Sequence, residues 1–222
     1  MKNSFPKFLS IHNPKTAGTT FLVMLRNLYE NKFHLHTGKV KPAGYRDYYV
    51  IHGHFDINFY SELERPVICF VRHPVERVIS HYYYWLQQPD RFNSECMKMM
   101  NNNWSLLDFV KYSNKMNVMS QYIGPNLDRF AFIGIFEDFE NSVMRFEELF
   151  EIKLPRIEPR RITMNKPEVS QEIRDIILEK NQDDMRIFEH AVTNHAEWLE
   201  SKLLVSAHAE LVKQFPWCYQ NV

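Results

Sequence analysis

Residues 7–29 read KFLSIHNPKTAGTTFLVMLRNLY, and this stretch decides the predicted fold class. It opens with a short, apolar, β-prone run over 7–12. A polar turn follows over 13–18, because the residue before Pro14 disfavours helical backbone angles. Beyond the turn, apolar side chains recur at helical spacing: Phe21, Leu22, Leu25 and Leu28. The pattern predicts a strand, a loop and a helix, in that order.

The same order returns further along the chain. Residues 66–71 form a continuous apolar run, which is typical of a strand covered on both faces of a parallel sheet. Pro74 suits the first position of a helix, and the helix dipole favours a carboxylate such as Glu76 in the first turn. A second strand–loop–helix unit is therefore predicted, with its helix ending near Gln87.

Further strands are predicted at 47–54 and 130–136, and further helices at 105–112, at 138–150 and from about 168. Strands that alternate with helices predict an α/β fold. We expect a P-loop-like, three-layer fold with a central, mostly parallel sheet flanked by helices. The length predicts a single domain over 1–222, helical in its C-terminal part.

Composition excludes several classes of protein. With 27 basic and 27 acidic residues the net charge is zero, which argues against a nucleic-acid partner. The 3 cysteines are an odd number without CxxC spacing, so they predict neither a disulfide framework nor a zinc site. The amino terminus lacks the apolar core of a signal peptide, and no apolar run approaches the ~18 residues of a membrane span. We therefore expect a soluble, cytoplasmic protein with no membrane span; the oligomeric state is not predicted.

The loop after the first strand has the chemistry of a phosphate site. A helix amino terminus offers N–H groups and a partial positive charge. Lys15 adds a full charge, Gly18 permits close approach of the backbone, and Thr19 and Thr20 supply hydroxyl donors. In a Walker A motif the lysine follows the glycine, whereas here Lys15 precedes Gly18. Taken alone, the loop also fits a plain turn before a helix.

The loop after the 66–71 strand has a matching pair of groups. Arg72 stands at the carboxyl end of this strand, where α/β sheets bind their ligands. Ser80 lies two helical turns further on, so both side chains can point to one oxyanion. The alternative is that Arg72 simply pairs with Glu76 at the start of the helix. Two basic loops at strand ends of one sheet favour a site for a ligand with two phosphate groups.

These segments resemble the donor-binding motifs of sulfotransferases that use 3′-phosphoadenosine 5′-phosphosulfate (PAPS). Residues 12–20, HNPKTAGTT, resemble the 5′-phosphosulfate loop, and residues 72–84, RHPVERVISHYYY, resemble the 3′-phosphate motif. His52-Gly53-His54 matches a His-Gly-His segment of the carbohydrate branch related to heparan sulfate 2-O-sulfotransferase. The chain departs from the family at His73, where Asp is common.

The resemblance implies a role for each matching residue. Lys15 would lie near the bridging oxygen of the donor and act in catalysis, while Arg72 and Ser80 would hold the 3′-phosphate. The rest of the donor loop would surround the phosphosulfate: Thr16, Ala17, Gly18, Thr19 and Thr20. The catalytic base would be a histidine of the His-Gly-His segment, with His54 favoured over His52. Histidine suits this task because it titrates near neutral pH.

The predicted function is in-line transfer of a sulfuryl group from PAPS to a hydroxyl group of a carbohydrate or related metabolite. The acceptor would be a glycan or a small molecule, and loops at 31–47 and 88–104 would contact this acceptor. No metal is expected. A nucleotide or metabolite kinase of P-loop type, dependent on ATP and magnesium, is an alternative. A non-catalytic nucleotide-binding module and a three-histidine zinc site are others. Arg156, Arg160 and Arg161 form either a solvated basic face or a clamp on the 3′ end of the donor.

Overall fold

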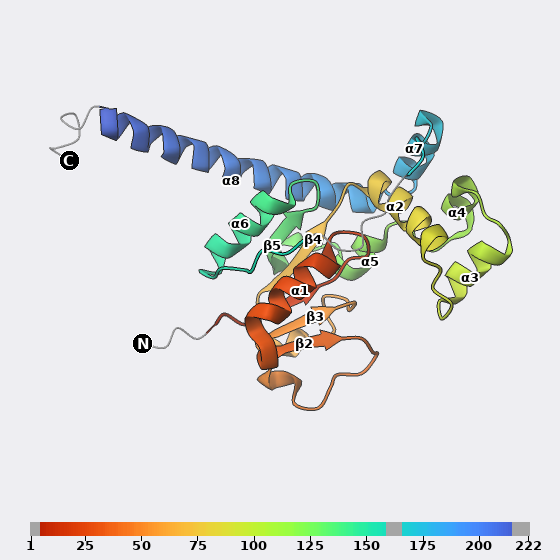
Figure 1. Cartoon of the computed structure of the whole chain (residues 1–222), viewed down its shortest axis with the longest axis horizontal. Helices are drawn as coiled ribbons and strands as arrows, with labels where there is room; N and C mark the ends of the chain where they lie inside the picture. Colours follow the sequence, from red (N-terminus) through yellow and green to blue (C-terminus); the bar gives the residue numbers. More distant parts are fainter. Residues whose placement is uncertain (1–4, 159–165, 215–222) are drawn as a thin grey trace.

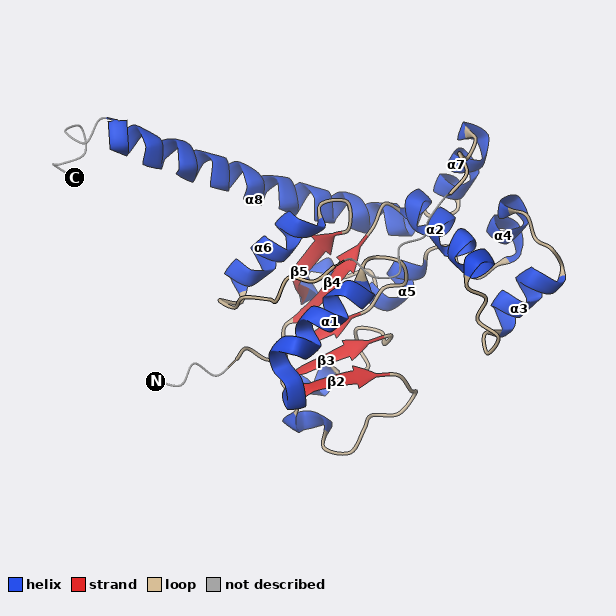
Figure 2. Ribbon diagram, viewed as in Figure 1, coloured by secondary structure: helices blue, strands red, loops and turns tan. Residues whose placement is uncertain are grey.

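The computed structural model describes residues 5–158 and 166–214, with side chains described up to residue 203. In this part of the chain five strands form one sheet in the order β2-β3-β1-β4-β5, and every neighbouring pair is parallel (Figures 1 and 2). The strands are β1 (Phe8–Ile11), β2 (Phe33–His36), β3 (Val50–Gly53), β4 (Val67–Val71) and β5 (Phe130–Ile135). The α/β fold class with a parallel sheet is confirmed.

Helices connect and cover these strands. The α-helices are α1 (Gly18–Tyr29), α2 (Pro74–Gln87), α3 (Ser94–Asn101), α4 (Leu106–Tyr112), α5 (Val118–Ile123), α6 (Phe139–Leu149), α7 (Gln171–Glu179) and α8 (Gln182–Gln214). Short 3-10 turns are η1 (Glu30–Lys32), η2 (Tyr45–Asp47), η3 (Ser61–Leu63) and η4 (Leu127–Arg129). The predicted C-terminal helical part is thus two helices. In the described residues, none of the helices combines the length and apolarity needed to cross a membrane.

Alternating side chains of the strands build two apolar layers, one on each face of the sheet. On one face Phe8 and Phe70 pack with residues of α1 and α6, such as Phe21 and Phe146. On the other face Leu9, Ile11, Cys69 and Val71 pack with residues of α5 and α8, such as Met119 and Ile187. Because strand side chains alternate between faces, near-continuous apolar strands are needed to fill both layers. A third apolar cluster joins α2, α3, α4 and α7 beside the sheet (Figure 1).

Two segments that were predicted as loops contain regular structure. The 31–47 stretch holds β2, and the 88–104 stretch holds α3. β2 has only four residues and contains two histidines, so its apolar signal is weak. α3 starts at an Asn93 cap, whose side chain accepts hydrogen bonds from the backbone N–H groups of Glu95 and Cys96.

The strand order places the functional loops side by side. From β1 the chain builds one side of the sheet with β2 and β3, and the other side with β4 and β5. The order therefore reverses between β1 and β4, and open α/β sheets bind ligands outside the carboxyl ends of the strands at such a point. The loops that carry Lys15 and Arg72 follow these two strands.

Candidate active site

Buried polar side chains hold the loop that follows β1. Asn13 is fully buried, and its Nδ2 donates to the Phe70 carbonyl oxygen at 2.9 Å, which ties the loop to β4. Thr16 Oγ1 donates to the Asn13 carbonyl oxygen, also at 2.9 Å. Lys15 and Ala17 have φ angles of 68° and 65°, which are unfavourable for residues other than glycine. The buried hydrogen bonds thus fix a backbone that these two residues do not readily adopt.

The start of α1 is shaped to receive a ligand. Ala17, the residue before the helix, has no polar side chain with which to cap the first N–H groups, and a helix amino terminus favours anions. A Cβ atom on Gly18 would lie 2.0 Å from the ring of His12. Position 18 therefore requires glycine, because the His12 ring packs directly against the first turn of α1.

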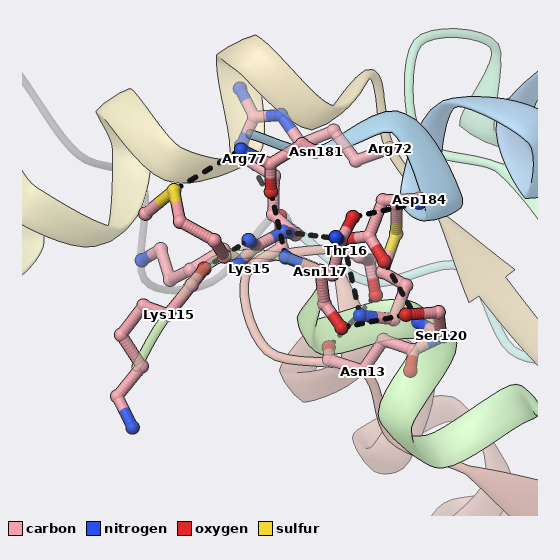
Figure 3. Close-up of polar contacts among 12 residues, drawn as sticks. Asn13, Lys15, Thr16, Arg72, Arg77, Lys115, Asn117, Ser120, Asn181 and Asp184 are labelled. Atoms are coloured by element: carbon pink, nitrogen blue, oxygen red, sulfur yellow. Dashed lines mark hydrogen bonds and ion pairs between the residues drawn. The ribbon is translucent and has the colours of Figure 1, made fainter. Parts of the chain in front are cut away.

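Arg72 follows β4 and reaches back to the first loop. Its Nη1 donates to the Lys15 carbonyl oxygen at 3.3 Å (Figure 3). Its guanidinium lies 4.0 Å from the centre of the Phe136 ring. Burial lowers the pKa of Arg72, while Glu137 and Glu76 oppose this effect. Glu76 itself forms ion pairs with Arg174 at 2.8 Å and with Lys166 at 3.9 Å. Arg72 is thus held by the loop after β1 and by an aromatic ring.

Both loops open into the same cavity, whose volume is about 940 Å³. It is lined by every predicted donor-binding residue except Thr16: Lys15, Ala17, Gly18, Thr19, Thr20, Arg72 and Ser80. Thr16 is 1% exposed and stabilises the loop from within. Pockets for small ligands commonly measure ~300–1,000 Å³, so this cavity can take a nucleotide. Lys15 and Arg72 therefore face one space, as a shared ligand requires.

Several other residues of the lining were not singled out from the sequence. They include apolar side chains from α1, α6 and the segment after α6: Met24, Phe139, Val143, Met144 and Ile157. The polar residues that sequence reasoning missed follow β5: Asp138, Glu140 and Asn141. Their position directly after a buried strand was the available signal. A cavity with a cationic part and an apolar part suits a phosphorylated ligand that also carries an apolar ring.

Two basic residues of the connector after α6 also line the cavity. Arg156 forms a bidentate pair with Glu147, at 2.7 and 3.0 Å, and Lys166 lies close enough to Arg72 for the two charges to interact. Burial and the Arg72 charge lower the pKa of Lys166, and Glu76 opposes them. Arg160 and Arg161 lie outside the described residues. Of the predicted arginine cluster, Arg156 therefore lies at the cavity wall.

The two histidines of the His-Gly-His segment have different environments. His52 is 1% exposed, its Nδ1 lies 2.8 Å from Ser10 Oγ, and burial lowers its pKa to about 3. His54 is exposed, although desolvation by the atoms packed around its ring lowers its pKa; a hydrogen bond with the His12 backbone works in the opposite direction. His54 is thus an accessible imidazole that stays neutral, whereas His52 is enclosed.

His12 connects this histidine pair with the cavity. Its ring centre lies 4.4 Å from that of His54 in a stacked arrangement and 5.0 Å from that of His52. His12 also lines the cavity beside Lys15. His54 follows β3, the strand next to β1, but it lies 42 residues further along the chain, so this stacking cannot be read from local spacing. In the described part of the chain, no group of three His, Cys, Asp or Glu side chains is arranged to hold a metal ion.

A buried ion pair supports the helix that carries Ser80. Arg77 and Asp184 are both 0% exposed, and Arg77 Nε lies 3.6 Å from Asp184 Oδ2 (Figure 3). Arg77 also donates to the Lys115 carbonyl oxygen at 2.6 Å, and Asp184 accepts from the N–H groups of Met119 and Ser120. These contacts fix α2 against α5 and α8. They therefore also fix the position of Ser80, which α2 carries, in the cavity wall.

The fold and the cavity define an α/β protein built to hold an anionic ligand, and comparison with known proteins gives its family. Residues 3–191 match the profile of the sulfotransferase family. This chain belongs to that family, as the motifs predicted.

Individual relatives are distant. An uncharacterized protein of Archaeoglobus fulgidus is 24% identical over 169 residues, which are 59% of this chain and 66% of that protein. The crystal structure of mouse sulfotransferase SULT7A1 complexed with PAP matches at 11% identity and a TM-score of 0.37, covering 78% of this chain and 62% of that chain. A sulfotransferase structure from Alicyclobacillus acidocaldarius matches at 12% identity and a TM-score of 0.42, covering 82% and 93%.

Proposed function

We propose that this protein is a PAPS-dependent O-sulfotransferase whose acceptor is a carbohydrate or a related metabolite. The observation that carries the proposal is that Lys15 and Arg72, from loops 57 residues apart in sequence, line the same cavity. The donor has two phosphate-bearing ends and a purine ring. The cavity offers a cationic loop for each end and apolar side chains for the ring, so its residues fit this ligand.

Each loop would bind one end of the donor. Lys15 and the amino terminus of α1 would stabilise the negative charge that builds up on the departing 5′-phosphate. Arg72 and Ser80, which line the cavity beside them, would hold the 3′-phosphate, which does not react. Thr19 and Thr20 add hydroxyl groups at the phosphosulfate end. When bound, PAPS supplies an activated sulfuryl group.

His54 would act as the general base. The acceptor oxygen forms a bond to sulfur as the bond from sulfur to the phosphate oxygen breaks, and the hydroxyl proton moves to His54. Its exposure leaves this residue reachable for an acceptor, and its lowered pKa keeps it unprotonated near neutral pH. His52, enclosed and bonded to Ser10, would support the strand end from within.

A thermal-shift titration separates this function from its alternatives. Adenosine 3′,5′-bisphosphate should raise the melting temperature more than ATP with magnesium, because Arg72 and Ser80 have a 3′-phosphate to bind. The reverse order would favour a kinase and contradict the proposal.

Incubation with ³⁵S-labelled PAPS and a panel of glycans, small alcohols and phenols then identifies the acceptor. If the donor analogue binds but no acceptor gains label, the protein is a nucleotide-binding module. The cytoplasmic location stays a prediction.

A further inference from the structure

The ammonium group of Lys15 lies on an aromatic ring. Lys15 Nζ is 3.7 Å from the centre of the Tyr84 ring, well inside the ~6 Å range of a cation–π contact. The ring belongs to α2, so the contact joins the loop after β1 to the helix after β4. A 69-residue separation in sequence shows that this contact depends on the fold.

Lys15 needs such a contact because its backbone is held in place whereas its side chain is flexible. Its backbone is held by the Arg72 bond to its carbonyl oxygen and by the neighbouring Asn13 and Thr16 hydrogen bonds. The side chain, however, is a flexible four-carbon stem, and lysine side chains carry ~2 kcal/mol of rotamer entropy. A fixed loop alone therefore does not place the ammonium group.

Tyr84 is well placed to restrict that stem. It lies one helical turn after Ser80, so both side chains stand on the same face of α2, and Ser80 lines the cavity. Tyr84 is half-buried, and it packs against the apolar cluster of α2, α3 and α4. The ring is thus anchored from behind while one face meets the ammonium group.

We propose that Tyr84 is a positioning residue, which holds the Lys15 ammonium at the cavity for the sulfuryl-transfer step. This inference rests on the proposed function. The ring face attracts the positive charge of the ammonium group, so it restricts the stem. Tyr84 acts through Lys15 and need not touch the donor.

A double-mutant cycle with the full chain tests this role. Tyr84→Leu should lower kcat about tenfold and leave the KM for PAPS and the affinity for adenosine 3′,5′-bisphosphate within about twofold. Tyr84→Phe, which keeps the ring face, should retain nearly full kcat. In a Lys15→Ala background, Tyr84→Leu should cause almost no additional loss, because the ammonium group is already absent.

Tyr83→Leu is the matched control, since Tyr83 is also a half-buried tyrosine packed against the same cluster. Its effect should be equal in both backgrounds. If Tyr84→Leu lowers kcat by the same factor with and without Lys15, the residue has only a packing role and the proposal is wrong. A wild-type protein without transfer activity would instead refute the proposed function, and with it the catalytic use of the contact.

The contact itself has a readout that is independent of activity. The Lys15 ε-methylene protons should show an upfield ring-current shift in NMR spectra of the lysine-labelled chain, assigned by loss of the signal in Lys15→Ala. The shift should persist in Tyr84→Phe and disappear in Tyr84→Leu. An unshifted wild-type signal would overturn the proposal whatever the kinetics show.

Discussion

At the scale of single residues, Lys15 is the group closest to the proposed chemistry. Lys15→Ala should lower kcat by ~10²–10³-fold, since one preorganised donor to a developing oxyanion is typically worth that much. Steady-state kinetics with labelled PAPS measure the effect. Lys7→Ala is the control, because Lys7 lies at the opposite end of β1 and contacts Tyr49. Near-normal turnover in Lys15→Ala would exclude its catalytic role.

The two histidines should respond differently to substitution. His54→Ala should lose ~10²–10⁴-fold in kcat and keep its affinity for adenosine 3′,5′-bisphosphate, because a general base contributes to proton transfer and not to donor binding. His52→Ala removes a buried hydrogen bond to Ser10, so it should lower the melting temperature. Kinetics and calorimetry on both variants separate the roles. If His52→Ala stays folded and His54→Ala stays active, the base has been assigned wrongly.

The pH profile follows from the lowered pKa of His54. The base must be neutral, so activity is present above its pKa and is lost as pH falls through it. Because the pKa lies below the ordinary 6.5, the acidic limb of kcat/KM should have its midpoint below pH 6.5. A midpoint above 6.5 would contradict this assignment. Measuring kcat/KM for the acceptor from pH 4.5 to 8 locates the limb.

At the scale of elements, a buried ion pair between Arg77 and Asp184 joins α2 to α8. Asp184→Ala leaves the Arg77 charge buried without its partner and removes the acceptor for two N–H groups of α5. Breaking a buried pair in this way costs about 3–5 kcal/mol in unfolding free energy. Urea unfolding followed by circular dichroism measures it.

The neighbouring residue supplies the control for this prediction. Asp183 is half-exposed and pairs with Arg186 on the same helix, so Asp183→Ala should change the unfolding free energy by less than about 0.5 kcal/mol. Equal effects of the two substitutions would show that the Arg77–Asp184 pair does not hold the helices together.

The elements also show which parts of the fold could be predicted from the sequence. β4 and α2 were predicted within a residue or two, because a continuous apolar run followed by Pro74 is a strong local signal. β2 was missed, since its pairing with β3 is set by the sheet and not by its own four residues. Position 53 needs glycine because a Cβ there would lie 2.3 Å from the His36 carbonyl oxygen, and this contact exists only in the folded sheet.

At the scale of the whole molecule, the sequence predicted which residues belong to the candidate site, but it did not predict which of their side chains contact one another. Lys15 and Arg72 were predicted as site residues because charged residues at strand ends of α/β proteins point to ligands, and they line one cavity. Two such contacts are the stacking of His12 on His54 and the contact of Lys15 with Tyr84. Both join separate elements, so no local sequence pattern could predict them. The strand order, which puts β1 beside β4, creates the shared cavity.

The most direct test of that shared cavity is calorimetric titration with two ligands that differ only in the 3′-phosphate. Arg72→Ala should weaken binding of adenosine 3′,5′-bisphosphate by ~10–100-fold, the usual value of hydrogen bonds to a charged group. The same variant should bind adenosine 5′-monophosphate within about twofold of wild type, because that ligand lacks the proposed partner. An equal loss for both ligands, or no loss for either, would show that Arg72 and Lys15 do not hold opposite ends of one nucleotide.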